Sequence, residues 1–220
     1  MSVYTQDDVK SRLRLYFICG STNVNRPLPT ILREAISGGI TMFQFREKGT
    51  NSLTGDKKLA LACELQAICQ EHHIPFIIND DVALAIKLNA DGIHVGQGDE
   101  SAASVREKIG RDKILGVSAN TLADAKQAIK DGATYIGTGP MYETSSKDDA
   151  DDVCGPERIK EFRQRGLTIP IVAIGGITAD NTPPILAAGA NGVSVISAIA
   201  GASSPAEAAA RFKKAIVNKF

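Results

Sequence analysis

The stretch PIVAIGGITADNTPPILAAGANGVSVIS at residues 170–197 decides the fold. It contains two short apolar runs, at residues 170–175 and 192–197, and a segment of helical composition, TPPILAA, lies between them. A continuous apolar run indicates a strand that is buried on both faces, which is typical of a parallel sheet covered by helices. The stretch therefore predicts a strand–helix–strand unit with parallel strands.

The same alternation extends outward through the rest of the chain. Apolar runs rich in Val, Ile and Phe, with helix-like segments between them, occur at residues 15–19, 41–45, 75–79, 92–95, 114–118, 134–138, 170–175 and 192–197. Eight such units in 220 residues predict a single (β/α)8 TIM barrel of the α/β class. An open doubly wound sheet is the alternative, but it needs a point where the strand order reverses, and nothing in the eightfold pattern asks for one.

Two segments stand apart from the eight units. Residues 1–13 form an N-terminal extension, in which residues 5–13 are expected to form an extra helix that covers the bottom of the barrel. Residues 143–154 (ETSSKDDADDVC) are polar and poor in apolar side chains, so they are expected to form an active-site loop. No shift in composition marks a second domain, and we expect residues 1–220 to form one.

The composition excludes several classes of protein. Hydrophobic residues make up 43% and charged residues 23% of the chain, a balance that excludes disordered and fibrous proteins. The 25 basic and 25 acidic side chains cancel, so a nucleic-acid surface or a polybasic membrane patch is not expected. The four cysteines do not have the spacing of a zinc or redox motif. With neither a signal peptide nor a long apolar run, the expected compartment is the cytoplasm.

Polar side chains gather where the predicted strands end, which is where this fold places its chemistry. After the second strand, alternation puts Gln44, Arg46 and Lys48 on one side and Phe45 and Glu47 on the other. An Arg and a Lys at the mouth of a barrel would bind an anion, since one offers a bidentate fork and the other a compact charge. A solvated charge cluster is the alternative.

The third and fourth strands lead into carboxylates. Asn79 and Asp80 end one strand and Asp99 follows the next, so the three could converge at the mouth. Two carboxylates suit Mg²⁺, which leaves its other positions to water or phosphate. The alternative for Asp80 is a turn or cap residue, whereas Asp81 is expected to cap the next helix. His94 lies inside a strand, where a lone histidine is usually a satisfied core group, and we assign it no catalytic role.

Hydroxyls and glycines end the remaining strands. Ser118 is expected either to hydrogen-bond a substrate oxygen or to cap the following helix. The loop after the sixth strand carries hydroxyls at residues 144–146 and then Lys147, which is typical of a phosphate cradle beneath a lid. Gly176 and Ser197, near the ends of the last two strands, match the backbone phosphate site that is common in these barrels.

Two anion sites therefore emerge, one charged and one built mainly from backbone groups. They indicate either two phosphorylated substrates or one substrate with a phosphate at each end. No Cys/His or Ser/His/Asp arrangement accompanies them, nor does a carboxylate pair placed for acid–base work. Chemistry without a strong base favours the departure of a diphosphate group, which charge neutralisation would assist.

At these residues the chain resembles the thiamine phosphate synthase family. The resemblance covers about residues 14–217 and is carried by these motifs: QFREK at 44–48, NDD at 79–81, HVGQ at 94–97 with Asp99, GVSA at 116–119, GTGP at 137–140 with the loop after it, AIGGI at 173–177 and GVSVISAI at 192–199. It implies a transferase that joins 4-amino-2-methyl-5-hydroxymethylpyrimidine diphosphate to hydroxyethylthiazole phosphate. The products would be thiamine monophosphate and diphosphate, formed through a pyrimidine-methyl cation.

The resemblance also implies a role for each candidate residue. The residues that would bind the pyrimidine diphosphate are Gln44, Phe45, Arg46, Glu47, Lys48, Asn79, Ser118 and Lys147. Those that would bind the thiazole phosphate are Thr144, Ser145, Ser146, Gly176, Ile196 and Ser197. The catalytic residues would be Arg46, Lys48, Ser118 and Lys147. Asp80 and Asp99 would hold Mg²⁺ as the cofactor.

One motif departs from the family, and three rival functions stay open. The family's loop commonly reads Pro-Thr-x-Thr-Lys, whereas this chain has Glu143 and Ser146 at the first and fourth positions, which bears on loop stiffness and thiazole-phosphate affinity. The rivals are the related thiazole tautomerase, which would not need Lys48, Asp80 or Asp99, a phosphosugar isomerase or epimerase, and a non-catalytic phosphate-binding barrel. The expected partners are small phosphorylated molecules, with neither nucleic acid nor membrane, and a homo-oligomer is compatible with the sequence.

Overall fold

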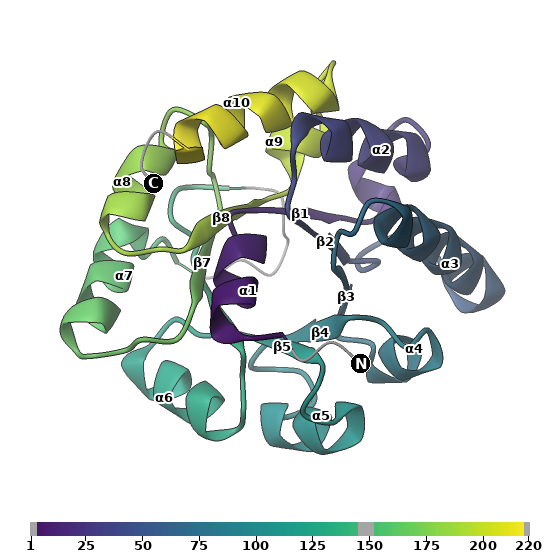
Figure 1. The fold of residues 1–220 in the computed structure, drawn as a ribbon. Helices are drawn as coiled ribbons and strands as arrows, with labels where there is room; N and C mark the ends of the chain where they lie inside the picture. The colour runs from purple at the N-terminus through teal and green to yellow at the C-terminus, as the bar shows by residue number, and fades with distance from the viewer. Residues whose placement is uncertain (1–3, 145–151, 218–220) are drawn as a thin grey trace.

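Eight parallel strands close into a barrel in the computed structural model, which describes residues 4–144 and 152–217 (Figure 1). The strands are β1 (Leu15–Cys19), β2 (Met42–Phe45), β3 (Phe76–Asn79), β4 (Gly92–Val95), β5 (Ile114–Ser118), β6 (Tyr135–Thr138), β7 (Ile171–Ile174) and β8 (Gly192–Val195). Each strand pairs with its neighbours in sequence, and β8 pairs with β1 to close the ring. The predicted barrel is therefore confirmed, and each of the eight apolar runs contains a strand.

Helices accompany the strands, and most of them form a ring around the barrel in Figure 1. They are α1 (Gln6–Arg12), α2 (Leu28–Gly38), α3 (Gly55–Glu71), α4 (Val82–Lys87), α5 (Ala102–Ile109), α6 (Leu122–Lys130), α7 (Gly155–Gln164), α8 (Thr182–Ala187), α9 (Ser197–Ala200) and α10 (Pro205–Val217), with a short 3-10 helix η1 (Ser21–Asn23). Helix α1 precedes β1 and α10 follows α9, whereas each of the other α-helices lies in a connection after a strand.

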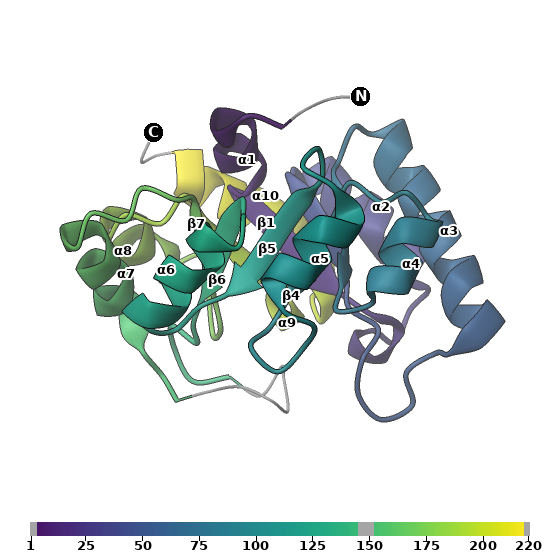
Figure 2. The same cartoon turned by 90° about the horizontal axis from the view of Figure 1, so that it is seen from below.

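The extra helix α1 covers one end of the barrel. Figure 1 looks down the barrel axis with α1 across its centre, and Figure 2 shows α1 at one end and α9 toward the other. Val9 on α1 and Leu13 just after it are buried against residues inside the barrel, such as Met42 and Ile114. The predicted N-terminal helix is confirmed, and it leaves the carboxyl ends of the strands as the open end.

Alternation along the strands divides the apolar residues into two cores. Tyr16, Ile18 and Met42 belong to the set inside the barrel. Phe17 and Phe43, one position along, belong to the larger set between the strands and the helices. The register pairs Ile18 with Gln44, so these two inward-facing residues lie side by side on neighbouring strands. The same alternation identifies the inward-facing residues of the other strands, and the site described below is built from them.

No helix within residues 4–144 and 152–217 is both long enough and apolar enough to cross a membrane.

Two arginines on the outer helices secure the end of the barrel where the strands begin. Arg163 on α7 donates from Nη1 to the carbonyls of Leu167 at 2.7 Å and Ile169 at 2.8 Å. Its Nε donates to the Gly189 carbonyl at 3.0 Å and its Nη2 to the Asn191 side chain at 2.9 Å. One guanidinium therefore satisfies the backbone of two loops.

Arg106 on α5 repeats this arrangement two strand–helix units earlier. It donates to the carbonyls of Gly110, Lys113 and Gly132, at distances of 2.6 to 3.1 Å. Gly132 lies 26 residues after Arg106, as Gly189 lies 26 residues after Arg163. Burial lowers the pKa of both arginines, yet both stay charged because a guanidinium group does not lose its proton in a protein. The two arginines thus act as equivalent ties in two units.

We predict that Arg163→Met lowers the free energy of unfolding by about 1–3 kcal/mol, because it leaves buried carbonyls without donors. Urea denaturation monitored by circular dichroism measures the change. Arg165→Met is the matched control, since Arg165 is exposed on the same segment and a change there should stay within about 0.5 kcal/mol. Equal effects of the two substitutions would contradict the role of Arg163.

Candidate active site

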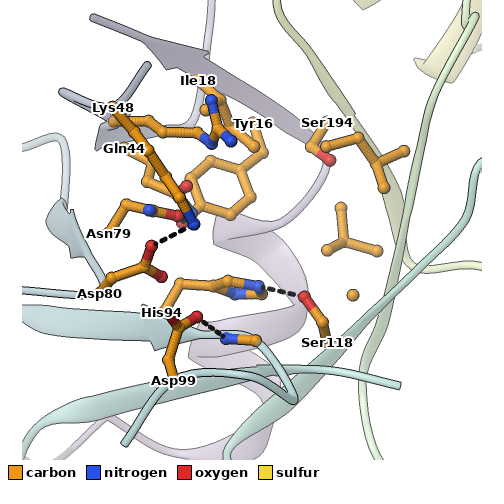
Figure 3. Close-up of a pocket in the computed structure, with 15 residues that line it drawn as sticks. Tyr16, Ile18, Gln44, Lys48, Asn79, Asp80, His94, Asp99, Ser118 and Ser194 are labelled. Carbon is orange, nitrogen blue, oxygen red and sulfur yellow. Dashed lines mark hydrogen bonds and ion pairs between the residues drawn. The ribbon is translucent and has the colours of Figure 1, made fainter. Parts of the chain in front are cut away.

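A pocket opens at the carboxyl ends of the strands, inside the barrel mouth (Figure 3). It encloses about 80 Å³ and is lined by Tyr16, Ile18, Gln44, Arg46, Lys48, Asn79, Asp80, His94, Gly96, Asp99, Ser118, Gly137, Val172, Ile174 and Ser194. A wider cavity of about 670 Å³ adjoins it and shares Lys48, Asp99 and Ser118 with it. The wider cavity extends to Thr144, so one continuous space links most of the predicted pyrimidine-diphosphate residues to the first residue predicted for the thiazole phosphate.

The end of β2 supplies three polar groups to the pocket. Gln44, Arg46 and Lys48 all line it, as the alternation in the sequence predicted. Gln44 is 2% exposed and Arg46 is 9% exposed, so the barrel wall holds both side chains. Charged groups in so sheltered a place interact with a bound anion more strongly than they would in open solvent.

The two residues between them serve the opposite side of the strand. Phe45 is buried in the outer core. The Glu47 carboxylate accepts hydrogen bonds from the backbone N–H of Ser21 at 2.8 Å, from its hydroxyl at 2.5 Å and from the Leu53 N–H at 2.7 Å. Neither side chain lines the two cavities described here. The binding role that the resemblance gives to these two residues stays a prediction, and the contacts shown are structural.

Asp80 and Asp99 lie next to each other on one side of the pocket, near Lys48 (Figure 3). The Lys48 ammonium lies 3.0 Å from the Asp80 carboxylate, and Asp99 accepts the Gly96 N–H at 2.8 Å. Burial raises the pKa of Asp80 above its usual range; Lys48 lowers it and the Asp99 carboxylate raises it further. Asp80 also adopts a left-handed backbone with φ of 61°, and such strain is concentrated at functional sites.

Asp81 has the capping role that the sequence predicted for it. Its side chain accepts the Leu84 N–H at 2.9 Å at the start of α4. Its other oxygen pairs with Lys58 of α3 at 2.7 Å. Both oxygens of Asp81 therefore interact with residues of α3 and α4, and Asp81 is not among the residues that line the pocket.

The donor set of Asp80 and Asp99 fits Mg²⁺ bound together with a phosphate. Carboxylate oxygens are the hard ligands that Mg²⁺ prefers, and the ion usually takes only one or two of them from the protein. Among the described residues, no three His, Cys, Asp or Glu side chains are grouped so that they could hold an ion. An ion held here would share its coordination with water and a substrate phosphate, and its charge would offset the repulsion between the two carboxylates.

Ser118 lines the pocket and does not cap the following helix. Thr121 provides that cap, since its hydroxyl accepts the Asp124 N–H at 3.1 Å. The Ser118 hydroxyl instead lies 3.0 Å from Nε2 of His94. The capping alternative for Ser118 is therefore wrong, and its contact with a substrate oxygen stays a prediction.

His94 is the most informative residue that the sequence analysis set aside. Its ring lies in the pocket lining, with Nδ1 2.9 Å from the Tyr135 hydroxyl and Nε2 on Ser118. Tyr16, Ile18 and Ser194 complete the lining from β1 and β8. Their signal in the sequence is strand parity, because each occupies an inward-facing position of its strand.

Three of the residues predicted for the thiazole phosphate, Gly176, Ile196 and Ser197, follow β7 and β8. Gly176 has φ of 62°, and a Cβ there would come within 2.5 Å of the Glu143 carbonyl, so only glycine fits beside this segment. Ile196 is buried and precedes α9, and Ser197 begins it. These three residues do not line the two cavities above. Ser145, Ser146 and Lys147 lie outside the described residues.

Comparison with known proteins identifies the family. The family model described as thiamine monophosphate synthase matches residues 15–199. A thiamine-phosphate synthase of Geobacillus thermodenitrificans (strain NG80-2) is 57% identical, over 98% of this chain and 97% of that protein. One of Bacillus cereus (strain AH187) is 51% identical over 100% of both chains.

A solved structure agrees with these relatives. A thiamine phosphate pyrophosphorylase from Pyrococcus furiosus superposes with a TM-score of 0.84 at 30% identity, covering 96% of this chain and 99% of that one. The family that the motifs resembled is thereby confirmed. The chain belongs to the thiamine monophosphate synthase family and is a transferase.

Proposed function

We propose that the chain condenses 4-amino-2-methyl-5-hydroxymethylpyrimidine diphosphate with hydroxyethylthiazole phosphate, releasing thiamine monophosphate and diphosphate. The observation that carries the proposal is the convergence of two cations, Arg46 and Lys48, and two carboxylates, Asp80 and Asp99, on one pocket. A mouth built in this way suits a diphosphate that arrives with a divalent cation. The cytoplasm remains the expected compartment.

In this proposal, each side chain at the pocket has a task that its position supports. Arg46 and Lys48 neutralise the diphosphate, one as a fork and the other as a point charge. The amides of Gln44 and Asn79 line the same pocket and hydrogen-bond the pyrimidine end. Lys147 keeps the diphosphate-binding role that the family resemblance implies.

Mg²⁺ held by Asp80 and Asp99 would neutralise charge on the diphosphate oxygens. Lys48 already contacts Asp80, so the protein holds positive and negative groups side by side before a substrate arrives. This arrangement limits the reorganisation that is needed when the leaving group gains charge.

The reaction itself needs little acid–base help from the protein. The C–O bond between the pyrimidine methylene and the diphosphate breaks, and the bonding electrons leave with the diphosphate. The thiazole nitrogen then uses its lone pair to form a C–N bond with the methylene carbon. No proton moves in these two steps, which agrees with the absence of an evident general base in the sequence. The pocket wall would exclude water, which competes for the same carbon.

Thr144 lines the wider cavity, which Lys48 and Ser118 also line, and this shared space supports a thiazole phosphate near Thr144. Ser145, Ser146, Gly176, Ile196 and Ser197 are proposed to hold that phosphate. Gly176 would offer backbone groups without an intervening side chain. This division places the two phosphorylated ends on different strands, so the reacting carbon and nitrogen would meet between them.

The functional test combines both substrates with Mg²⁺ and the purified chain. We expect thiamine phosphate to form, detected by its fluorescence after oxidation. The thiazole phosphate alone, monitored for isomerisation, tests the tautomerase alternative. Condensation without isomerisation supports the proposal, whereas isomerisation without condensation would replace it.

Arg46→Ala should lower kcat by roughly 10²- to 10³-fold, because it removes charge stabilisation of the departing diphosphate. Single-turnover kinetics at saturating substrates measure the change. Arg33→Ala on the outer helix α2 is the matched control, since Arg33 pairs with Glu71 at the surface and its loss should leave kcat within about twofold. Near-normal turnover of the Arg46 variant would remove it from the site.

Chelation by excess EDTA should abolish turnover, and added Mg²⁺ should restore it, because the diphosphate would otherwise leave with its charge uncompensated. Asp99→Asn should raise the Mg²⁺ concentration for half-maximal activity at least tenfold, whereas Asp112→Asn, at an exposed position, should not change it. Activity that persists in EDTA would exclude the metal role of Asp80 and Asp99.

A further inference from the structure

A chain of hydrogen bonds crosses the inside of the barrel beneath the pocket. It runs from Gln44 to Tyr16 at 2.8 Å, to Tyr135 at 3.0 Å, to His94 at 2.9 Å and to Ser118 at 3.0 Å. We call these five residues the interior chain. They come from five different strands, and its two ends, Gln44 and Ser118, both line the pocket. The function proposed above uses the two ends and leaves the middle without a task.

Counting hydrogens gives the interior chain a direction. The Gln44 amide N–H donates to the Tyr16 oxygen, so the single phenolic hydrogen of Tyr16 goes to Tyr135, the other partner that the structure gives it. Tyr135 then has one hydrogen left, which it donates to Nδ1 of His94. Because a neutral imidazole carries one N–H, the hydrogen of His94 is on Nε2 and points to Ser118.

The consequence at the pocket is a defined direction for the hydroxyl hydrogen of Ser118. The Ser118 hydroxyl accepts from His94, so its own hydrogen is left for an acceptor atom in the cavity. If the Gln44 amide were turned over, each hydrogen bond would reverse, and Ser118 would donate to His94 instead. The orientation of one amide is thereby transmitted across the barrel by two phenols.

Packing leaves the interior chain no room to rearrange. A Cβ at position 116 would lie 2.3 Å from the Tyr135 oxygen and 2.4 Å from Nδ1 of His94. A Cβ at position 137 would lie 3.2 Å from Cε1 of His94. Tyr16 and Tyr135 are 1% and 0% exposed, and burial raises the pKa of both well above the usual range. Both phenols thus keep their hydrogens at working pH.

We propose that Tyr16 and Tyr135 are positioning residues that set the tautomer of His94 and, through it, the direction of the Ser118 hydroxyl. The alternative is that the two phenols only satisfy each other in the core. The two differ in what a hydroxyl deletion does: a purely structural pair loses stability, whereas a positioning pair also changes which nitrogen of His94 carries the hydrogen.

The tautomer is measured directly in protein labelled with ¹⁵N-histidine, by long-range ¹H–¹⁵N correlation spectra, with His94→Asn used to assign the signal. His72 and His73 are exposed and serve as internal references. In the unaltered chain we expect the hydrogen on Nε2. Tyr16→Phe and Tyr135→Phe should each give a mixture of tautomers, because Nδ1 no longer faces an obligatory donor.

Tyr4→Phe is the matched control. The Tyr4 hydroxyl also donates to a partly buried side chain, the Asp91 carboxylate, at 3.1 Å. This contact lies near the end of the barrel that α1 covers. Its loss should leave the His94 signal unchanged. Gln44→Glu provides the opposite test at pH 8: the carboxylate can only accept, so the interior chain should reverse and the hydrogen should move to Nδ1.

The kinetic part of the test rests on the proposed function. Tyr16→Phe and Tyr135→Phe should each lower kcat for condensation roughly tenfold, in line with the loss of one oriented hydrogen bond, and leave KM for the thiazole phosphate unchanged. A His94 hydrogen on Nδ1 in the unaltered chain, or an unchanged tautomer in both Phe variants or in Gln44→Glu, would overturn the interior chain. If the tautomers behave as expected but the unaltered chain forms no thiamine phosphate, the proposed function fails and the interior chain stands.

Discussion

Closure of eight short parallel strands on themselves leaves a single interior, and alternate residues of each strand must share it. Toward the end covered by α1, the shared space is filled by apolar side chains such as Met42 and Ile114. Toward the open end, the inward positions are Gln44, His94 and Ser118. Gln44, Tyr16 and Tyr135 are almost fully buried there, so their polar groups must be satisfied by other side chains. The site is thus a direct product of strand parity.

Much of this could be foreseen from the sequence. The apolar runs located the strands because a parallel sheet buried on both faces tolerates few polar residues. Alternation correctly separated Arg46 from Glu47. His94 could not be assigned in the same way, because its partners Tyr135 and Ser118 come from other strands and become neighbours only through the barrel register. Tyr16, which looked like an ordinary strand residue, was missed for the same reason.

The electrostatics at the mouth combine opposite demands. A diphosphate site needs cations and a magnesium site needs carboxylates. The folded protein must accommodate both kinds of charge when nothing is bound. The 3.0 Å pair of Lys48 and Asp80 meets this need, while burial and Asp99 act against ionisation of Asp80. Spacing in the sequence could show that these groups were near strand ends, but not that a lysine and an aspartate from adjacent strands would pair.

Through Glu47, the segment from Gln44 to Lys48 also has a structural role. On its outer side, one carboxylate joins the turn after β1, through Ser21, to the connection before α3, through Leu53. Arg46 and Lys48, which face inward, therefore lie on a segment that Glu47 hydrogen-bonds to two connections. A longer connection after β2 could be engineered to admit a bulkier heterocycle. Such a design would have to preserve the hydrogen bond from the Leu53 amide to Glu47, because its loss would loosen the segment that carries Arg46 and Lys48.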